Sequence, residues 1–256
     1  MSNNPNVNSK SKSRKSSVSG SNDNLALATA IYALRHPRGR YDNTRASQLS
    51  GIPRSTLYEW RRNGIYVPDF SGDKPATWSY GDLLYLRLLA WLRQCGMERH
   101  TASKAVRSIK LQIIAGQEIR YFFADRHTLM VDEERTNRVT GQTILPFSDL
   151  SGLFRTFDIL NPVPELGGGK LSRLWAPDLI MPSPMTFISP WVMAGDPCIA
   201  HTRIPTSSIY ALKEERGLSS LEIVDLYPGL TVDSVDDAYL LERRLRNFDL
   251  PTSTAA

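Results

Sequence analysis

The sequence has little of what a metal centre, a disulfide-bonded domain or a membrane protein needs. Its 256 residues include 2 cysteines and 4 histidines, and none of them stands at the spacing of zinc ligands. Cys95 and Cys198 lie far apart, so we expect two buried thiols in a reducing cytoplasm. No apolar run approaches the roughly 18 residues of a membrane helix, and the polar N-terminus lacks a signal-peptide core. We therefore predict a cytoplasmic protein, not bound to a membrane, without metal or cofactor. No cluster of residues in the sequence indicates an enzyme.

Charge of the two signs is unevenly distributed along the chain. Residues 1–24 carry four basic side chains and one acidic side chain, and residues 35–66 carry seven arginines and two acidic side chains, a balance of 7 − 2 = +5. Residues 183–249 carry six basic and ten acidic side chains, a balance of 6 − 10 = −4. This asymmetry predicts that a polyanion such as DNA binds the N-terminal part and that a different partner binds the C-terminal part.

Residues 43–64 show the pattern of a helix–turn–helix. Asn43 or Thr44 is placed to cap a first helix, and Gly51 allows a tight turn before the second. Apolar side chains recur at helical spacing and are predicted to face inward. They are Ala46, Leu49, Ile52, Leu57 and Trp60.

The other face of the predicted second helix is basic and polar, and Arg54, Tyr58 and Arg61 recur along it at i, i+4 and i+7. Arginine can bond guanine edges bidentately or hold a phosphate. We predict that four residues enter the major groove of duplex DNA, namely Arg54, Ser55, Tyr58 and Arg61. We predict that three further residues contact phosphates, namely Arg45, Arg62 and Lys74. The alternative is a solvated basic helix in a small bundle.

Composition divides the chain into five segments. Residues 1–24 are rich in Ser, Asn and Lys and predict a disordered basic tail. Residues 25–117 form the predicted helix–turn–helix domain, in which Ser79 and Asp82 make a capping box and Thr101 opens a later helix that runs to about Ala115. Residues 118–160, with a strand candidate over 142–147 among others, predict a small antiparallel β section. That section is a spacer, a dimer contact or a ligand sensor. Residues 161–184 hold five prolines and three adjacent glycines and predict a linker. Residues 185–249 predict a C-terminal domain of three helices, in which Ser219 and Glu222 form a capping box for the second helix.

The N-terminal part resembles the MerR-like and excisionase-like winged helix–turn–helix group. The resemblance rests on residues 43–64, on Trp78–Leu83 opening the next helix, and on the break at Gly96 and Met97. It covers about residues 41 to 115. It implies a mainly α fold with small β elements, and we expect a homodimer that reads an inverted repeat with half-sites about one helical turn apart.

The C-terminal part resembles the bacterial domain of unknown function 433. The residues that carry this are Gly195–Pro205, Gly217–Ser219 and Leu226–Thr231, although the usual pattern has a glycine where His201 stands. The resemblance covers about residues 185 to 246 and implies a tri-helical, homeodomain-like domain. The family is associated with VapB-type antitoxins, which implies a VapC-type toxin, a PIN-domain ribonuclease, as the partner.

The last predicted helix separates charges of opposite sign. Its start carries Asp233 and Asp236, which suit the helix dipole and would repel DNA phosphates. Its end carries Arg243, Arg244 and Arg246, which we assign with the two aspartates to partner binding; a second DNA contact through the arginines is the alternative. We predict a DNA-binding antitoxin that represses its own operon. The alternative function is a MerR-like transcriptional regulator without a toxin.

Overall fold

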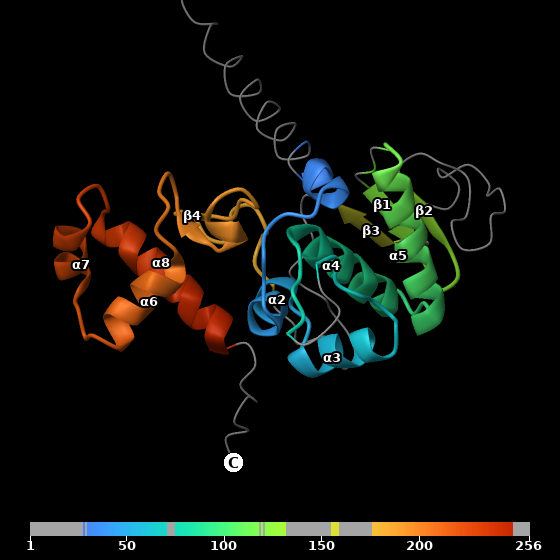
Figure 1. Ribbon diagram of the computed structural model, residues 1–256, viewed down its shortest axis with the longest axis horizontal. Helices are drawn as coiled ribbons and strands as arrows, with labels where there is room; N and C mark the ends of the chain where they lie inside the picture. Colours follow the sequence, from blue (N-terminus) through green and yellow to red (C-terminus); the bar gives the residue numbers. More distant parts are fainter. Residues whose placement is uncertain are drawn as a thin grey trace, which may run out of the picture.

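The structure is a computed structural model that describes residues 28, 30–70, 75–117, 119, 121–131, 155–158 and 176–247. Helices dominate, and the strands form two small antiparallel sheets, which confirms the predicted fold class (Figure 1). Several predictions fall outside the described residues: the basic tail, a predicted strand over 142–147, most of the predicted linker, and Lys74.

A short helix over residues 30–35 precedes two helices joined by a tight turn, α2 (Asn43–Ser50) and α3 (Arg54–Arg62). The carboxylate of Asp42 accepts a hydrogen bond from the Arg45 amide at 2.7 Å, so the cap is Asp42 and neither of the two predicted residues, Asn43 or Thr44. Gly51 adopts φ of 76°, a left-handed conformation that glycine allows without steric cost. All five predicted inward side chains are at most 4% exposed. The local geometry predicted for residues 43–64 is therefore present.

The central helix of the molecule is α4 (Tyr80–Gln94), and α5 (Arg99–Ile114) packs beside it. Ser79 and Asp82 form the predicted capping box at the start of α4. The structure caps α5 with Glu98, whereas Thr101 was predicted to open this helix. Every residue from 80 to 92 is buried, as expected for a helix surrounded by protein on all sides.

A three-stranded sheet covers part of α4. Its strands are β1 (Tyr121–Ala124), β2 (Leu129–Val131) and β3 (Arg155–Asp158), in the order β2-β1-β3 and antiparallel throughout. Phe122 pairs with Phe157 across the sheet, and the Phe157 ring lies 5.3 Å from the Trp91 ring of α4. The antiparallel β section predicted for residues 118–160 is thus observed where the structure describes it.

The C-terminal part combines a small sheet of two short antiparallel strands with three helices. Strands β4 (Thr186–Phe187) and β5 (Cys198–Ile199) pair, and the 3₁₀ turn η2 (Met193–Gly195) lies between them. The helices are α6 (Thr206–Glu214), α7 (Ser220–Leu226) and α8 (Val232–Arg246). Ser219 with Glu222 caps α7 as predicted, and Thr231 caps α8. His201 has φ of 62°, a conformation that favours glycine.

The N-terminal and C-terminal parts share a hydrophobic core. A small cluster is confined to the C-terminal part, but Leu241 and Leu245 of α8 belong to the large cluster built around α4. Leu179 and Ile188 join the same cluster, and the Tyr80 hydroxyl donates to the Leu179 carbonyl at 2.8 Å. The described end of the predicted linker is therefore packed structure, which corrects the linker prediction for residues 176–184.

Candidate nucleic-acid interface

The face of α3 that points away from the core carries the predicted DNA-reading side chains. Arg54, Ser55, Tyr58 and Arg62 are exposed, and Arg61 is half-buried. The guanidinium of Arg61 lies 5.6 Å from the centre of the Tyr58 ring, a cation–π distance that holds both groups on one face. The structure therefore brings these five residues together on one helix.

The acidic residue of this face is neutralised from a neighbouring helix. Glu59 forms an ion pair with Arg99 of α5, with 2.6 Å between Oε1 and Nη1. Both side chains are more than 40% exposed, so the pair contributes little to stability. Its consequence is electrostatic: the negative charge of Glu59 is balanced, and the arginines of α3 determine the sign of the surface.

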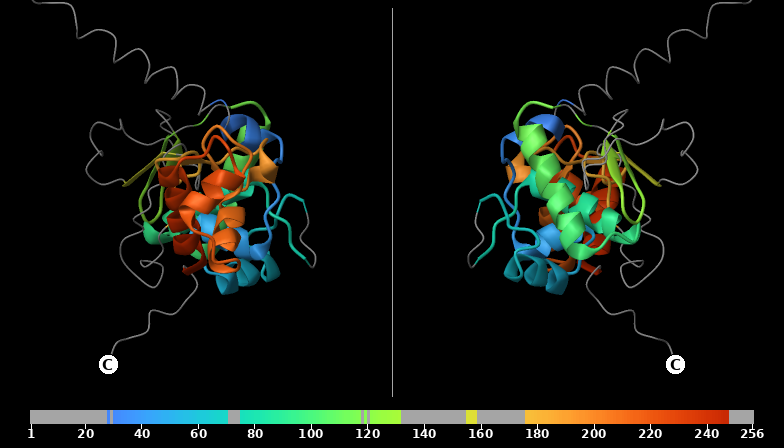
Figure 2. Two further views of the ribbon diagram at one scale, coloured as in Figure 1. Left: turned by 90° about the vertical axis from the view of Figure 1, so that its left-hand side faces the viewer. Right: turned by 90° about the vertical axis from the view of Figure 1, so that its right-hand side faces the viewer.

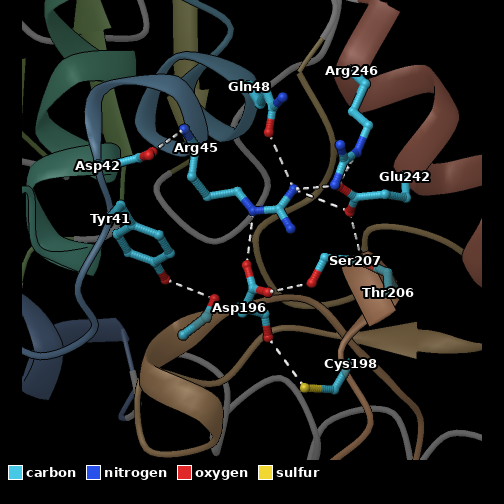
Figure 3. A network of polar contacts seen from close by, with 11 residues as sticks. Tyr41, Asp42, Arg45, Gln48, Asp196, Cys198, Thr206, Ser207, Glu242 and Arg246 are labelled. Carbon is cyan, nitrogen blue, oxygen red and sulfur yellow. Dashed lines mark hydrogen bonds and ion pairs between the residues drawn. The ribbon is translucent and has the colours of Figure 1, made fainter. Parts of the chain in front are cut away.

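Arg45, a predicted phosphate contact, has a different role in the structure. Its Nε donates to Asp196 at 2.7 Å, and its Nη1 donates to Glu242 at 3.1 Å (Figure 3). The side chain is 13% exposed, and a third bond from Nη1 reaches Gln48 at 3.1 Å. Burial disfavours its charge, yet Glu242 and Asp196 together raise the pKa of Arg45 above its ordinary value. We therefore remove Arg45 from the proposed DNA contacts.

The two carboxylates that bind Arg45 are themselves fixed by the C-terminal part. Glu242, only 1% exposed, accepts from the Thr206 hydroxyl at 2.8 Å and from Arg246 Nε at 3.0 Å. Asp196 accepts from the Ser207 hydroxyl at 3.2 Å. We call Arg45, Asp196 and Glu242 the junction triad, because it joins α2 to the C-terminal part. Residues before α2 strengthen the joint.

Next to the junction triad, two backbone carbonyls of the turn η2 accept hydrogen bonds from the chain before α2. The Tyr41 hydroxyl donates to the Gly195 carbonyl at 2.9 Å, and the Arg40 amide donates to the Ala194 carbonyl at 2.8 Å. Gly195 has φ of 91°, and a Cβ atom there would lie 2.0 Å from the Tyr41 hydroxyl. The close approach of the two parts therefore requires glycine at this position.

A buried arginine fixes the end of α2. Arg87 of α4 is 3% exposed, and its Nη2 donates to the carbonyls of Leu49 and Pro177, both at 2.5 Å. Burial lowers the pKa of Arg87 to about 10. One guanidinium thus connects the turn before α3 to the packed segment that precedes the C-terminal part.

A buried acidic network holds the chain that follows α3. Asp82 accepts hydrogen bonds from the Tyr66 hydroxyl at 2.8 Å and from the amides of Ser79 and Asp69 at 2.7 and 3.0 Å. Lys110 of α5 pairs with Asp69 and lies 3.9 Å from Asp82. Burial, assisted by the charge of Asp69, raises the pKa of Asp82 to about 6. The network fixes the path of the chain from α3 to α4.

The residues predicted to bind a partner through α8 do not form one cluster. Asp236 pairs with Lys213 at 2.6 Å, and Arg246 pairs with Glu242 while its guanidinium lies 4.3 Å from the Tyr210 ring. These two side chains hold the C-terminal part together. The remaining three predicted residues are exposed, namely Asp233, Arg243 and Arg244.

Sequence reasoning missed several residues of the interface and its supports. Glu242 and Asp196 gave no signal, because their partner lies 197 and 151 positions away along the chain. Lys104 and Arg107 of α5 are exposed beside the end of α3. Their three-residue spacing on the polar face of a predicted helix was the available signal, but it did not reveal which element they adjoin.

Comparison with known proteins identifies the C-terminal part alone. The family described as "Protein of unknown function (DUF433)" matches residues 188–240. This confirms the resemblance predicted for that part of the chain. No curated protein and no solved structure matches the chain. In the described parts of the chain, no helix has the length and apolar character needed to cross a bilayer.

Proposed function

We propose that the protein binds duplex DNA through α3 and regulates transcription, as the antitoxin of a type II toxin–antitoxin pair that represses its own operon. The observation that carries the DNA proposal is the face of α3. Four exposed side chains and Arg61 extend from a helix whose other side is fixed by Leu57 and Trp60 in the core. Helices presented in this way place base-contacting side chains in the major groove.

The contacts divide by chemistry into base reading and phosphate binding. Arg54, Ser55, Tyr58 and Arg61 are the proposed base-reading group, since arginine offers a bidentate donor pair to guanine and serine suits any base. Arg62, exposed in the last turn of α3, is the proposed phosphate contact. A homodimer would present two copies of α3 to an inverted repeat, with half-sites about one helical turn apart.

The test is binding of the full chain to the duplex upstream of its own gene, followed by fluorescence anisotropy. The double variant Arg54→Gln/Arg61→Gln removes both proposed guanine contacts and is expected to weaken binding by at least about 30-fold, from about 1 kcal/mol or more per contact. The matched control is Arg203→Gln/Arg216→Gln, which removes the same charge from exposed positions of the C-terminal part and is expected to bind as wild type. The proposal would be refuted if the wild-type protein does not bind the duplex at low salt, or if the double variant binds it with wild-type affinity.

The toxin partnership rests on the match of residues 188–240 and on the antitoxin association of the family that this part resembles. The proposed partner is a VapC-like PIN-domain ribonuclease. Co-expression of the chain with the adjacent reading frame tests this, with a stable complex and inhibition of the ribonuclease as the expected result.

A second function, a transcriptional regulator without a toxin, has its own supporting observation. The C-terminal part is joined to α2 through the junction triad and through a shared core. Through these contacts, a ligand or partner bound to the C-terminal part can change the arrangement of the DNA-binding helices α2 and α3. Failure of the adjacent gene product to bind, with DNA binding intact, would favour the regulator over the antitoxin.

A further inference from the structure

A second basic surface adjoins α3 and belongs to α5. Lys104 and Arg107 are both exposed and stand three residues apart, so they project from one side of the helix. The opposite side of α5 is fixed in the core by Ala105, Val106 and Ile109, each at most 3% exposed. The two cations are therefore held on a rigid element.

Direct contacts join this surface to the end of α3. Arg107 Nη2 donates to the Gly64 carbonyl at 3.3 Å, and the Ser103 hydroxyl donates to the Ile65 carbonyl at 2.6 Å. An open cavity of about 310 Å³ lies between α5 and the segment that follows α3, lined in part by Tyr66 and Arg107. The basic surface of α5 is thus joined to the chain directly after α3.

The charge of this surface is not cancelled by neighbouring acids. Arg99 pairs with Glu59, and Lys110 pairs with Asp69, so these two cations are neutralised. Within the described ranges, neither Lys104 nor Arg107 forms an ion pair with a carboxylate. Two positive charges therefore remain available to an external anion.

We propose that Lys104 and Arg107 bind phosphates of the DNA backbone beside the site read by α3, so that the duplex runs across α5. This inference rests on the proposed DNA-binding function and names the path of the same ligand. A lysine and an arginine at the flank of a reading helix suit phosphate contact, which positions the duplex without reading sequence.

The position of α5 also gives the duplex a direction. In Figure 1, α5 and the C-terminal helices α6 to α8 lie at opposite ends of the molecule, with α3 between them, and the two end views of Figure 2 have the C-terminal helices in front in one and α5 in front in the other. Residues 183–249 have a net charge of 6 − 10 = −4, so a polyanion is repelled at that end. Charge therefore favours a duplex that leaves α3 towards α5.

The experiment measures how the affinity for duplex DNA depends on salt concentration. Each phosphate contact contributes about 0.9 to the slope of log K against log[salt]. Lys104→Gln/Arg107→Gln is therefore expected to reduce the slope by about 1.8 while the preference for the specific sequence over a random duplex is retained. Lys104→Gln alone removes an exposed side chain without an ion pair and is expected to reduce it by about 0.9.

The control is Arg203→Gln/Arg216→Gln, which removes two exposed cations of the C-terminal part and is expected to leave the slope unchanged. A wild-type slope in Lys104→Gln/Arg107→Gln would overturn the proposed path while leaving α3 as the reading helix. The same is true if the control lowers the slope as much as the α5 variant does. Absence of duplex binding by the wild-type chain would instead refute the proposed function, so the two failures are distinguishable.

Discussion

Replacement of Arg45 by leucine tests whether the junction triad holds α2 against the C-terminal part. The substitution leaves Glu242, whose side chain is 2% exposed, without its main cation. Breaking a buried ion pair in this way costs about 3–5 kcal/mol. Glu242 keeps its bonds to Thr206 and Arg246, and Asp196 is 28% exposed and can be hydrated. We therefore expect the lower end, about 3 kcal/mol of the free energy of unfolding.

The assay is urea unfolding followed by circular dichroism, with thermal melting as a second readout. A loss of about 3 kcal/mol corresponds to a fall in Tm of about 6–12 °C for a chain near this size. Arg54→Leu is the matched control, because Arg54 is exposed and its loss is expected to stay within about 0.5 kcal/mol. The double variant Arg45→Leu/Glu242→Leu is expected to recover much of the loss, since apolar pairs often replace buried ion pairs at little cost. A cost below about 1 kcal/mol for Arg45→Leu would refute the reasoning.

Three further predictions concern stability. Burial holds the pKa of Asp82 at about 6 in the folded protein, above its ordinary value near 4. The neutral carboxyl group therefore stabilises the fold below about pH 4, and this contribution to the free energy of unfolding is lost as the pH rises through 6. Wild type should therefore lose stability relative to Asp82→Asn in urea titrations from pH 4 to 7, and a constant difference would contradict this. Gly195→Ala is expected to cost at least about 2 kcal/mol more than Gly217→Ala, because a Cβ at Gly195 would lie 2.0 Å from the Tyr41 hydroxyl, whereas one at Gly217 meets nothing within 4 Å; equal melting temperatures would exclude the steric explanation. Ser219→Ala removes the cap of α7 and is expected to cost about 1 kcal/mol by urea unfolding, with no change indicating that the capping box is dispensable.

Features decided within one helical turn could be predicted from the sequence. The capping boxes at Ser79 and Ser219 and the turn at Gly51 depend on residues at most three positions away. The first cap was misplaced by one residue, because Asp42 and Asn43 are adjacent residues of similar capping ability. Local hydrogen-bonding chemistry thus located these helix starts to within a residue, whereas the start of α5 was misplaced, because Glu98 and not Thr101 caps that helix.

Features that depend on distant residues could not be predicted. In the sequence, Arg45 stands in the first helix at a position that also suits a phosphate contact. Only the folded chain brings the carboxylate of Glu242 to its guanidinium. The segment before β4 has the composition of a linker, yet Leu179 is 1% exposed because a core formed by other segments receives it. Periodicity indicates which face of an element is buried, but it does not identify the element that covers it.

The core shared between α4 and α8 has a practical consequence for any attempt to divide this protein. A fragment that ends before α8 would expose the apolar surface against which Leu241 and Leu245 pack, and an isolated C-terminal fragment would expose these two leucines and Glu242. Calorimetry of the intact chain should accordingly show a single cooperative endotherm, and a protease cut between the halves should release neither as a stable product.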